Sequence, residues 1–301
     1  SSSARRLVLV PTLAAAATAI LLLIASDAGG HPWALFLFAF SAFALSALIG
    51  EFWRAGAARR RLTGEPMPRA LGRAVARNRR RYGGYVVHAG IALLLIGIAA
   101  SSSFQTNRDV RLAVGESAEV GDYTLRYSEL TADPKSERIS FGARLDVTRD
   151  GEPYATLNPA RNHYPTQDPM AGAIGRYFMG ESTSEIGISS EAGGDLWTAF
   201  QPDLSVLNPD IVRGNRMLAD AGPNAQGVAI IALANAYAAN PPPATFRVIV
   251  NPLVSWIWIG ALIALAGAVL AAWPELEARR QLEAAYRARL GRELGAANPP
   301  A

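Results

Sequence analysis

Four long apolar stretches dominate the pattern of hydrophobic and polar positions along the chain. They cover residues 7–26, 33–50, 82–101 and 251–273, contain no Asp, Glu, Lys or Arg, and hold a single histidine, His88. A helix of about 20 apolar residues is long enough to cross the ~30 Å hydrocarbon core of a bilayer. The pattern therefore predicts four transmembrane helices. Trp33, Trp53 and Trp273 stand near helix ends, where aromatic side chains suit the membrane interface.

A different pattern fills the region between the third and fourth stretches. Apolar and polar residues alternate with a period of two over 110–114, 123–127 and 141–147, which is typical of half-buried strands. Asp150-Gly151 follows, and Asp-Gly is a strong signal for a two-residue hairpin turn. Further strands are expected over residues 154–158, 185–189, 196–200 and 245–250. We expect a small antiparallel barrel or sandwich inserted between helices three and four.

Two segments leave alternatives open. The alanine-rich run 228–239 is compatible with a short helix or with a mobile insertion within 205–243. At the C-terminal end, Leu282, Tyr286, Leu290 and Leu294 recur every fourth residue, which predicts an amphipathic helix. That helix is interpreted as a solvated tail in preference to a docking helix.

Arginine distribution predicts the orientation in the membrane. Residues 51–81 hold ten arginines against Glu51 and Glu65, whereas residues 102–249 hold 18 acidic against 12 basic side chains. Because positively charged loops stay in the cytoplasm, both termini are expected inside and the β domain outside. The expected division is 1–53 (helices one and two), 54–81 (basic cytoplasmic loop), 82–101 (helix three with His88), 102–250 (extracytoplasmic β domain), 251–273 (helix four) and 274–301 (cytoplasmic amphipathic tail).

Composition narrows the class further. Half of the 301 residues are hydrophobic, which favours a membrane protein. With no cysteine, thiolate metal sites and a Cys-x-x-Cys-His haem attachment motif are excluded. The net charge of +4 lies beside the membrane and does not indicate nucleic-acid binding. A signal peptide at the start is the less favoured alternative to span one, because its apolar part is too long. With no initiating Met, the chain is expected to be the C-terminal part of a longer protein.

His88 is the residue most suggestive of chemistry. An ionisable side chain within a membrane span is costly and is a functional-site hypothesis by default. Six residues after Tyr82, at ~1.5 Å per residue, place it about 9 Å into the membrane. Gly84 and Ala92 share its helix face and predict a shallow groove for a flat macrocycle, and Arg81 is placed to meet carboxylates. The alternative is an interhelical hydrogen bond to Ser or Thr. His31 and His163 are interpreted as surface histidines, and a zinc site or catalytic triad has little support.

Several stretches of the chain resemble the C-terminal part of CcmF, the haem lyase component of bacterial cytochrome c maturation. They are Arg80 to Gly90, Leu157 to Arg161 with Tyr164-Pro165, Thr183 to Ile186, Asp195 to Trp197, and Asn251 to Gly260. The resemblance extends from span one to the end of span four in the same order. The segment 205–243 is longer than the family pattern.

The resemblance implies a component of a haem lyase in the bacterial inner membrane, incomplete without the N-terminal half of the family. It implies a b-type haem held by two transmembrane histidines, of which His88 matches the second. Implied partners are the N-terminal half with its tryptophan-rich haem-binding segment, the haem chaperone, and apocytochrome c with its thiol-reducing and apocytochrome-handling maturation proteins. No role passes to His31. The competing interpretations are a membrane-anchored extracytoplasmic scaffold or sensor without haem and, with less support, a transporter.

Overall fold

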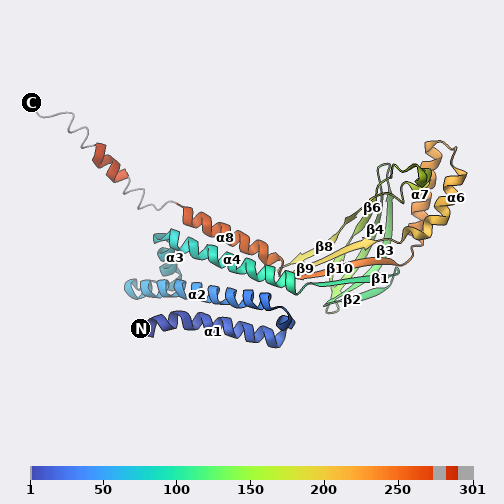
Figure 1. Cartoon of the computed structure of the whole chain (residues 1–301). Coiled ribbons are helices and arrows are strands. Elements are labelled where there is room, and N and C mark those ends of the chain that lie inside the picture. Colours follow the sequence, from blue (N-terminus) through green and yellow to red (C-terminus); the bar gives the residue numbers. More distant parts are fainter. Residues whose placement is uncertain (1, 274–282, 291–301) are drawn as a thin grey trace, which may run out of the picture. The chain divides into compact units, whose positions relative to one another are not determined.

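The computed structural model describes residues 2–273 and 283–290 and divides the chain into two compact units (Figure 1). The first unit comprises residues 1–103 and 256–301, and the second comprises residues 104–255. The described part of the first unit is helical. Four helices of the described residues are long and apolar enough to cross a membrane, as the hydropathy pattern predicts. These helices are α1 (Ser2–Ala25), α2 (Pro32–Thr63), α4 (Arg79–Ser103) and α8 (Ser255–Ala272).

The segment expected to be a basic loop is mostly helical. Helix α2 continues to Thr63 and ends where Gly64 adopts a φ of +69°, a left-handed conformation that glycine adopts without strain. Helix α3 (Met67–Arg77) follows, and Asn78 separates it from α4. Glu65 is bound by Arg59 and Arg73, so one carboxylate ties the end of α2 to α3. The arginines of this segment therefore lie on ordered helices.

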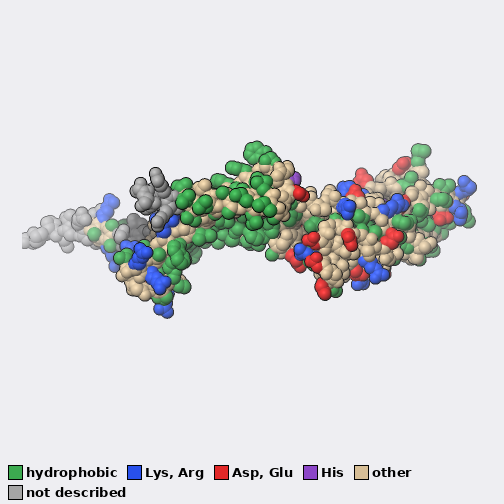
Figure 2. Space-filling model, turned by 90° about the horizontal axis from the view of Figure 1, so that it is seen from below, with side chains coloured by type: hydrophobic (Ala, Val, Ile, Leu, Met, Phe, Trp, Pro, Cys, Tyr) green, Lys and Arg blue, Asp and Glu red, His purple; other side chains and the backbone are tan. Residues whose placement is uncertain are grey.

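Glycines bring α4 and α8 into close contact. A Cβ atom at Gly83 would lie 2.5 Å from the backbone nitrogen of Ala271, and one at Gly90 would lie 2.4 Å from that of Ala264. On α8, Gly260 and Gly267 make equally close approaches to α4. Small residues let membrane helices approach until backbones touch, and dispersion then holds the pair. Figure 2 shows the complementary result, hydrophobic side chains gathered on the outer surface of the helical unit.

The second unit is a β-sandwich with two antiparallel sheets. One sheet has the order β1-β10-β9-β8; the other has the order β2-β3-β4-β6-β7, with β5 paired to β4. The strands are β1 (Thr106–Leu112), β2 (Ser117–Val120), β3 (Tyr123–Pro134), β4 (Ile139–Arg149), β5 (Glu152–Leu157), β6 (Ala160–His163), β7 (Ser182–Glu185), β8 (Gly187–Glu191), β9 (Gly194–Gln201) and β10 (Ala244–Pro252). The expected sandwich or barrel is thus a sandwich.

The alternation seen in the sequence builds the core of the sandwich. Every second residue of β4, and of β3 from Tyr123 to Tyr127, faces inward, and the buried aromatic rings of Tyr127, Phe200 and Phe246 pack across the two sheets. The Asp150-Gly151 turn forms as expected, with φ of +52° and +83° at its two residues. Positive φ at both positions is what a type I′ hairpin turn requires.

Two predictions, one of a strand and one of the start of a helix, need correction. The strand expected over 185–189 is two strands, because the chain leaves one sheet after Glu185 and joins the other at Gly187. The start of helix four at residue 251 is also wrong: β10 continues through Pro252, and Leu253 turns with a φ of +54° before α8 begins. Strands β2 and β6 were not expected at all.

The 205–243 segment is ordered and helical. Helix α6 (Asn208–Met217) and helix α7 (Pro223–Ala239) cover one end of the sandwich in Figure 1. Tyr237 of α7 is buried, packs edge-on against Phe141 with ring centroids 5.1 Å apart, and donates its hydroxyl to the Asp203 carbonyl. Of the two alternatives that the sequence leaves open, the short helix is therefore the one that forms, and these contacts place it on the sandwich core.

Residues 283–290 of the expected C-terminal amphipathic helix are helical and exposed, including Tyr286 and Leu290. Leu282 and Leu294 lie outside the described residues.

Candidate functional site

The imidazole of His88 is oriented by the backbone of its own helix. Its Nδ1 lies 2.7 Å from the carbonyl oxygen of Gly84, one turn earlier on α4. A carbonyl oxygen only accepts hydrogen bonds, so Nδ1 carries the proton and donates it. In the neutral ring Nε2 then holds a lone pair, and within the described residues no hydrogen-bond partner is recorded for it. The ring presents one free nitrogen base.

His88 lies on the side of α4 away from α8. At 3.6 residues per turn it stands about 140–160° around the helix from Gly83 and Gly90, which contact α8. Its side chain is exposed, and a Cβ atom added at Gly84 would meet nothing within 4 Å. Ala92 is only 2% exposed, because neighbouring protein covers it. The expected groove between Gly84 and Ala92 therefore does not extend to Ala92, whereas open space lies beside Gly84.

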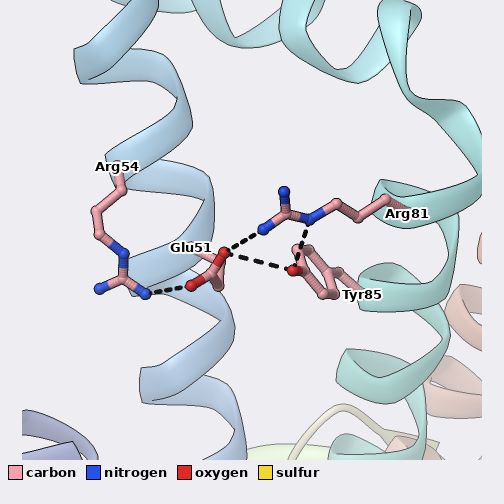
Figure 3. A network of polar contacts seen from close by, with 4 residues as sticks. All are labelled: Glu51, Arg54, Arg81 and Tyr85. Carbon is pink, nitrogen blue, oxygen red and sulfur yellow. Dashed lines mark hydrogen bonds and ion pairs between the residues drawn. The ribbon is translucent and has the colours of Figure 1, made fainter. Parts of the chain in front are cut away.

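Arg81 belongs to a polar network between α2 and α4 (Figure 3). Its Nη2 lies 2.7 Å from Oε2 of Glu51, and its Nε donates to the Tyr85 hydroxyl at 2.8 Å. Glu51 also accepts from Arg54 at 2.6 Å and faces the Tyr85 hydroxyl at 3.3 Å. One carboxylate thus compensates part of the charge of two guanidinium groups.

The network lies on the same face of α4 as His88. Arg81, Tyr85 and His88 are spaced by four and three residues, so they share one face of α4. Glu51 holds the first two of these side chains, and Asn78 caps the start of the helix through the Arg81 backbone N–H at 3.3 Å. Reasoning from the sequence missed Glu51 and Tyr85. The Arg81-Tyr85-His88 spacing was the available signal.

The chemistry of this face suits one axial ligand to iron. A neutral imidazole with Nδ1–H bonded to a carbonyl and Nε2 free is the usual form of a metal-binding histidine. Open space at Gly84 leaves room beside the ring. His31, the other histidine of the helical unit, is half-buried where α2 begins. In the part of the chain that the structure covers, no three His, Cys, Asp or Glu side chains gather as a metal site.

His163 is not a surface residue, and that interpretation was wrong. It lies on β6, is 6% exposed, and its ring packs edge-on against Phe141 at 6.0 Å between centroids. Neither ring nitrogen has a partner within the described residues. Burial, together with the positive charge of Arg161, lowers the pKa of His163 to about 4. The ring is therefore a neutral member of the sandwich core.

These features define a polytopic membrane protein that carries a β-sandwich between its last two spans. Residues 103–205 match the family model described as the CcmF C-terminal beta-sandwich. The chain is CcmF-like and corresponds to the C-terminal part of such proteins, as the sequence resemblance indicated.

Similar curated proteins are named as cytochrome c-type biogenesis proteins. CcmF of Haemophilus influenzae is 26% identical over 64% of this chain, and CcmF of Pseudomonas aeruginosa is 27% identical over 64%. NrfE of Haemophilus influenzae is 24% identical over 63%. Each match covers 22% of the relative, so the chain spans about a fifth of the length of these proteins.

A solved structure has the same fold. It is named Cytochrome c Heme Lyase CcmF, and the likeness has a TM-score of 0.55 at 22% identity, over 88% of this chain and 34% of that one. At this identity the likeness supports the fold alone, and it does not assign residue roles.

Proposed function

We propose that this chain acts in bacterial cytochrome c biogenesis as part of a membrane haem lyase. Relatives named for that process, together with the CcmF-type sandwich at residues 103–205, support the assignment. The observation that carries the proposal is the free Nε2 of His88, held in the ligating tautomer on an exposed face of α4.

His88 is the proposed axial ligand of a b-type haem, through Nε2. When bound, the haem supplies a redox-active iron whose potential depends on its axial ligands and surroundings. An unpartnered polar nitrogen facing hydrocarbon costs free energy, so this face is expected to be covered in the working protein. The hydrogen bond to Gly84 fixes the ring, and the space beside Gly84 admits the edge of the macrocycle.

Arg81 is the proposed contact for a haem propionate, with a share of its charge already held by Glu51. Its Nε and Nη2 are engaged, which leaves the Nη1 donors for a second carboxylate. The Arg81–Glu51 pair would then keep the arginine in place whether or not the propionate is present.

The proposed topology places both termini in the cytoplasm and the sandwich outside. The arginine-rich segment of α2 and α3 supports this orientation. The N-terminal half of the family, with its tryptophan-rich segment, would supply the first of the two histidines. The haem chaperone delivers haem, and the sandwich faces apocytochrome c and the proteins that keep its thiols reduced.

An absorption spectrum tests the haem proposal. The chain is co-expressed with the N-terminal part of a CcmF protein, purified, and compared with a His88→Ala variant. We expect a b-type Soret band that falls at least tenfold in the variant, because the iron loses one axial bond. A band that is indifferent to the substitution would refute the ligand assignment.

His31→Ala is the matched control, since this histidine also lies in the helical unit but off the proposed face. It should leave the band intact. The complete absence of a band from the co-expressed, correctly assembled protein would favour the competing function, a membrane-anchored scaffold or sensor that uses only the sandwich.

A further inference from the structure

A pocket of about 530 Å³ opens on the sandwich where the chain crosses between its two sheets. Strand β7 belongs to the six-stranded sheet and β8 to the four-stranded sheet, with Ile186 between them. Ile186 lines the pocket together with Arg161 and Ser184 on one side and Trp197 of β9 and Arg247 of β10 on the other. A cavity of this size falls within the range of ligand sites.

The crossover leaves two strand edges beside this pocket. Strand β8 pairs with β9 only as far as Gly187 opposite Thr198, whereas β10 pairs with β9 as far as Gln201. Ala199 to Gln201 thus have a neighbouring strand on one side. Strand β7 ends its sheet and pairs with β6 alone in the described residues. Edges of this kind present unpaired backbone donors and acceptors to an incoming strand.

The two arginines of the pocket differ in how their charge is compensated. Arg247 binds Asp109 through two hydrogen bonds of 2.8 and 2.9 Å. Arg161 donates its Nε to Ser182 and its Nη1 to Ser184, which are neutral hydroxyls, and no carboxylate partner is recorded for it in the described residues. Its two serine contacts hold the guanidinium in place, and the Nη2 donors stay available. A guanidinium in this state favours a carboxylate.

Residues from three separate stretches of the sequence line the pocket. Arg161 ends the 157–161 stretch, Ser184 and Ile186 belong to 183–186, and Trp197 ends 195–197, all three of which carry the resemblance to CcmF. The alternative explanation is a seam left wherever a chain changes sheets. A seam accounts for the cavity, but not for a half-buried cation held by two hydroxyls next to an indole ring.

We propose that this pocket binds an extended peptide segment of a partner protein, with an Asp or Glu side chain on Arg161 and an apolar side chain against Ile186 and Trp197. The peptide lies along the free edge of β7 or β9 and completes the backbone pairing that the crossover interrupts. The positive charge of Arg161 and the open edges select this occupant. The site is independent of His88 and goes beyond the proposed haem function.

Selection from a random heptapeptide library tests the site. The purified full chain in detergent micelles is the target, and empty micelles remove background binders. We expect enrichment of peptides with an acidic residue at one fixed position between apolar or β-branched residues. A synthetic selected peptide should bind at least tenfold more tightly than its Glu→Gln or Asp→Asn counterpart, which changes nothing in the protein fold.

Protein variants then locate the contact. Arg161→Gln should abolish the preference for the acidic peptide, while Arg144→Gln, an exposed arginine of β4 paired with Asp146 outside the pocket, should preserve it. No enrichment, enrichment without acidic residues, or a preference that survives Arg161→Gln would overturn the proposal. So would equally tight binding of free acetate. His88→Ala should leave peptide binding unchanged, which separates this site from the haem proposal.

Discussion

Two of the three histidines, His88 in the helical unit and His163 in the sandwich, have opposite environments. His88 is exposed on a helix that is apolar enough to span a membrane, and among the described residues only one of its ring nitrogens has a hydrogen-bond partner. His163 is buried in the core of the sandwich, where neither ring nitrogen has a partner among those residues. In the sandwich a buried histidine is a packing residue. In the helical unit the exposed histidine has no such packing role, and lipid offers its second nitrogen no hydrogen-bond partner.

The same contrast holds for the two units as a whole. The sandwich buries its aromatic residues between sheets, whereas the helices expose Phe36, Trp53 and Trp258 and bury glycines where they meet. Hydrophobic burial from water stabilises the sandwich. Close backbone packing stabilises the helical unit, where apolar surface gains nothing by leaving lipid.

Truncation of a core ring should have the largest effect on stability. Phe141→Ala removes a fully buried ring that packs on both Tyr237 and His163, so we expect about 3–5 kcal/mol of lost stability in the sandwich. Hydrogen-exchange mass spectrometry of the full chain in micelles measures this locally. Phe36→Ala, at a ring that is 57% exposed, is the control and should change the exchange little. Equal effects would contradict the division into two packing regimes.

The glycine contacts predict a smaller, face-specific effect. Gly90→Ala puts a Cβ within 2.4 Å of the α8 backbone, which forces the helices apart at a cost of about 1–3 kcal/mol. Faster exchange in α4 and α8, but not in the sandwich, is the expected measurement.

Gly84→Ala is the matched control for this change. It lies on the same helix, and its added methyl group meets nothing within 4 Å. Hydrogen exchange of α4 in the Gly84→Ala chain should equal that of the parent chain or be slightly slower, because alanine favours the helix. If both substitutions loosen α4 alike, backbone propensity and not contact with α8 governs the helix.

Local pattern predicted the parts of the fold that depend on one segment at a time. The four spans follow from length and polarity, and the Asp150-Gly151 turn follows from its positive φ angles. The crossover at Ile186 was missed because strand partners, not period, decide that the chain changes sheets there. Helix four was given an early start because an uncharged run does not separate the end of a strand from the start of a helix.

The sites show the same limit. His88 was evident because a histidine in an apolar stretch is rare, and that assignment as a haem ligand stays a prediction. The burial of His163 was hidden by its Arg161, Asn162 and Tyr164 neighbours, which suggested a polar loop. His163 instead belongs to the short strand β6, which pairs with β4 and β7, and in this strand the His163 side chain faces the core. Glu51 was counted as a loop acid, and only the pairing of α2 with α4 gives it a role.

The pH dependence of the stability of the sandwich should reveal the burial of His163. Its folded pKa of about 4 lies below the ordinary value of 6.5, so the unfolded chain binds more protons between these values. The histidine's contribution to stability is thus complete above about pH 6.5 and is lost progressively as the pH falls to about 4.

His163→Phe keeps a ring against Phe141 and removes the titration. Hydrogen exchange of the sandwich, compared between pH 7 and pH 4.5 after correction for intrinsic rates, should show a smaller loss of protection in the variant. Carboxylates held below their usual pKa, such as Asp146 beside Ser128, are common to both chains and cancel in the difference. His31→Phe, which removes a histidine from the other unit, should retain the parental loss. An identical loss in the His163→Phe chain would mean that the buried ring does not titrate against folding, and that burial in the sandwich leaves this histidine as free to take a proton as one in water.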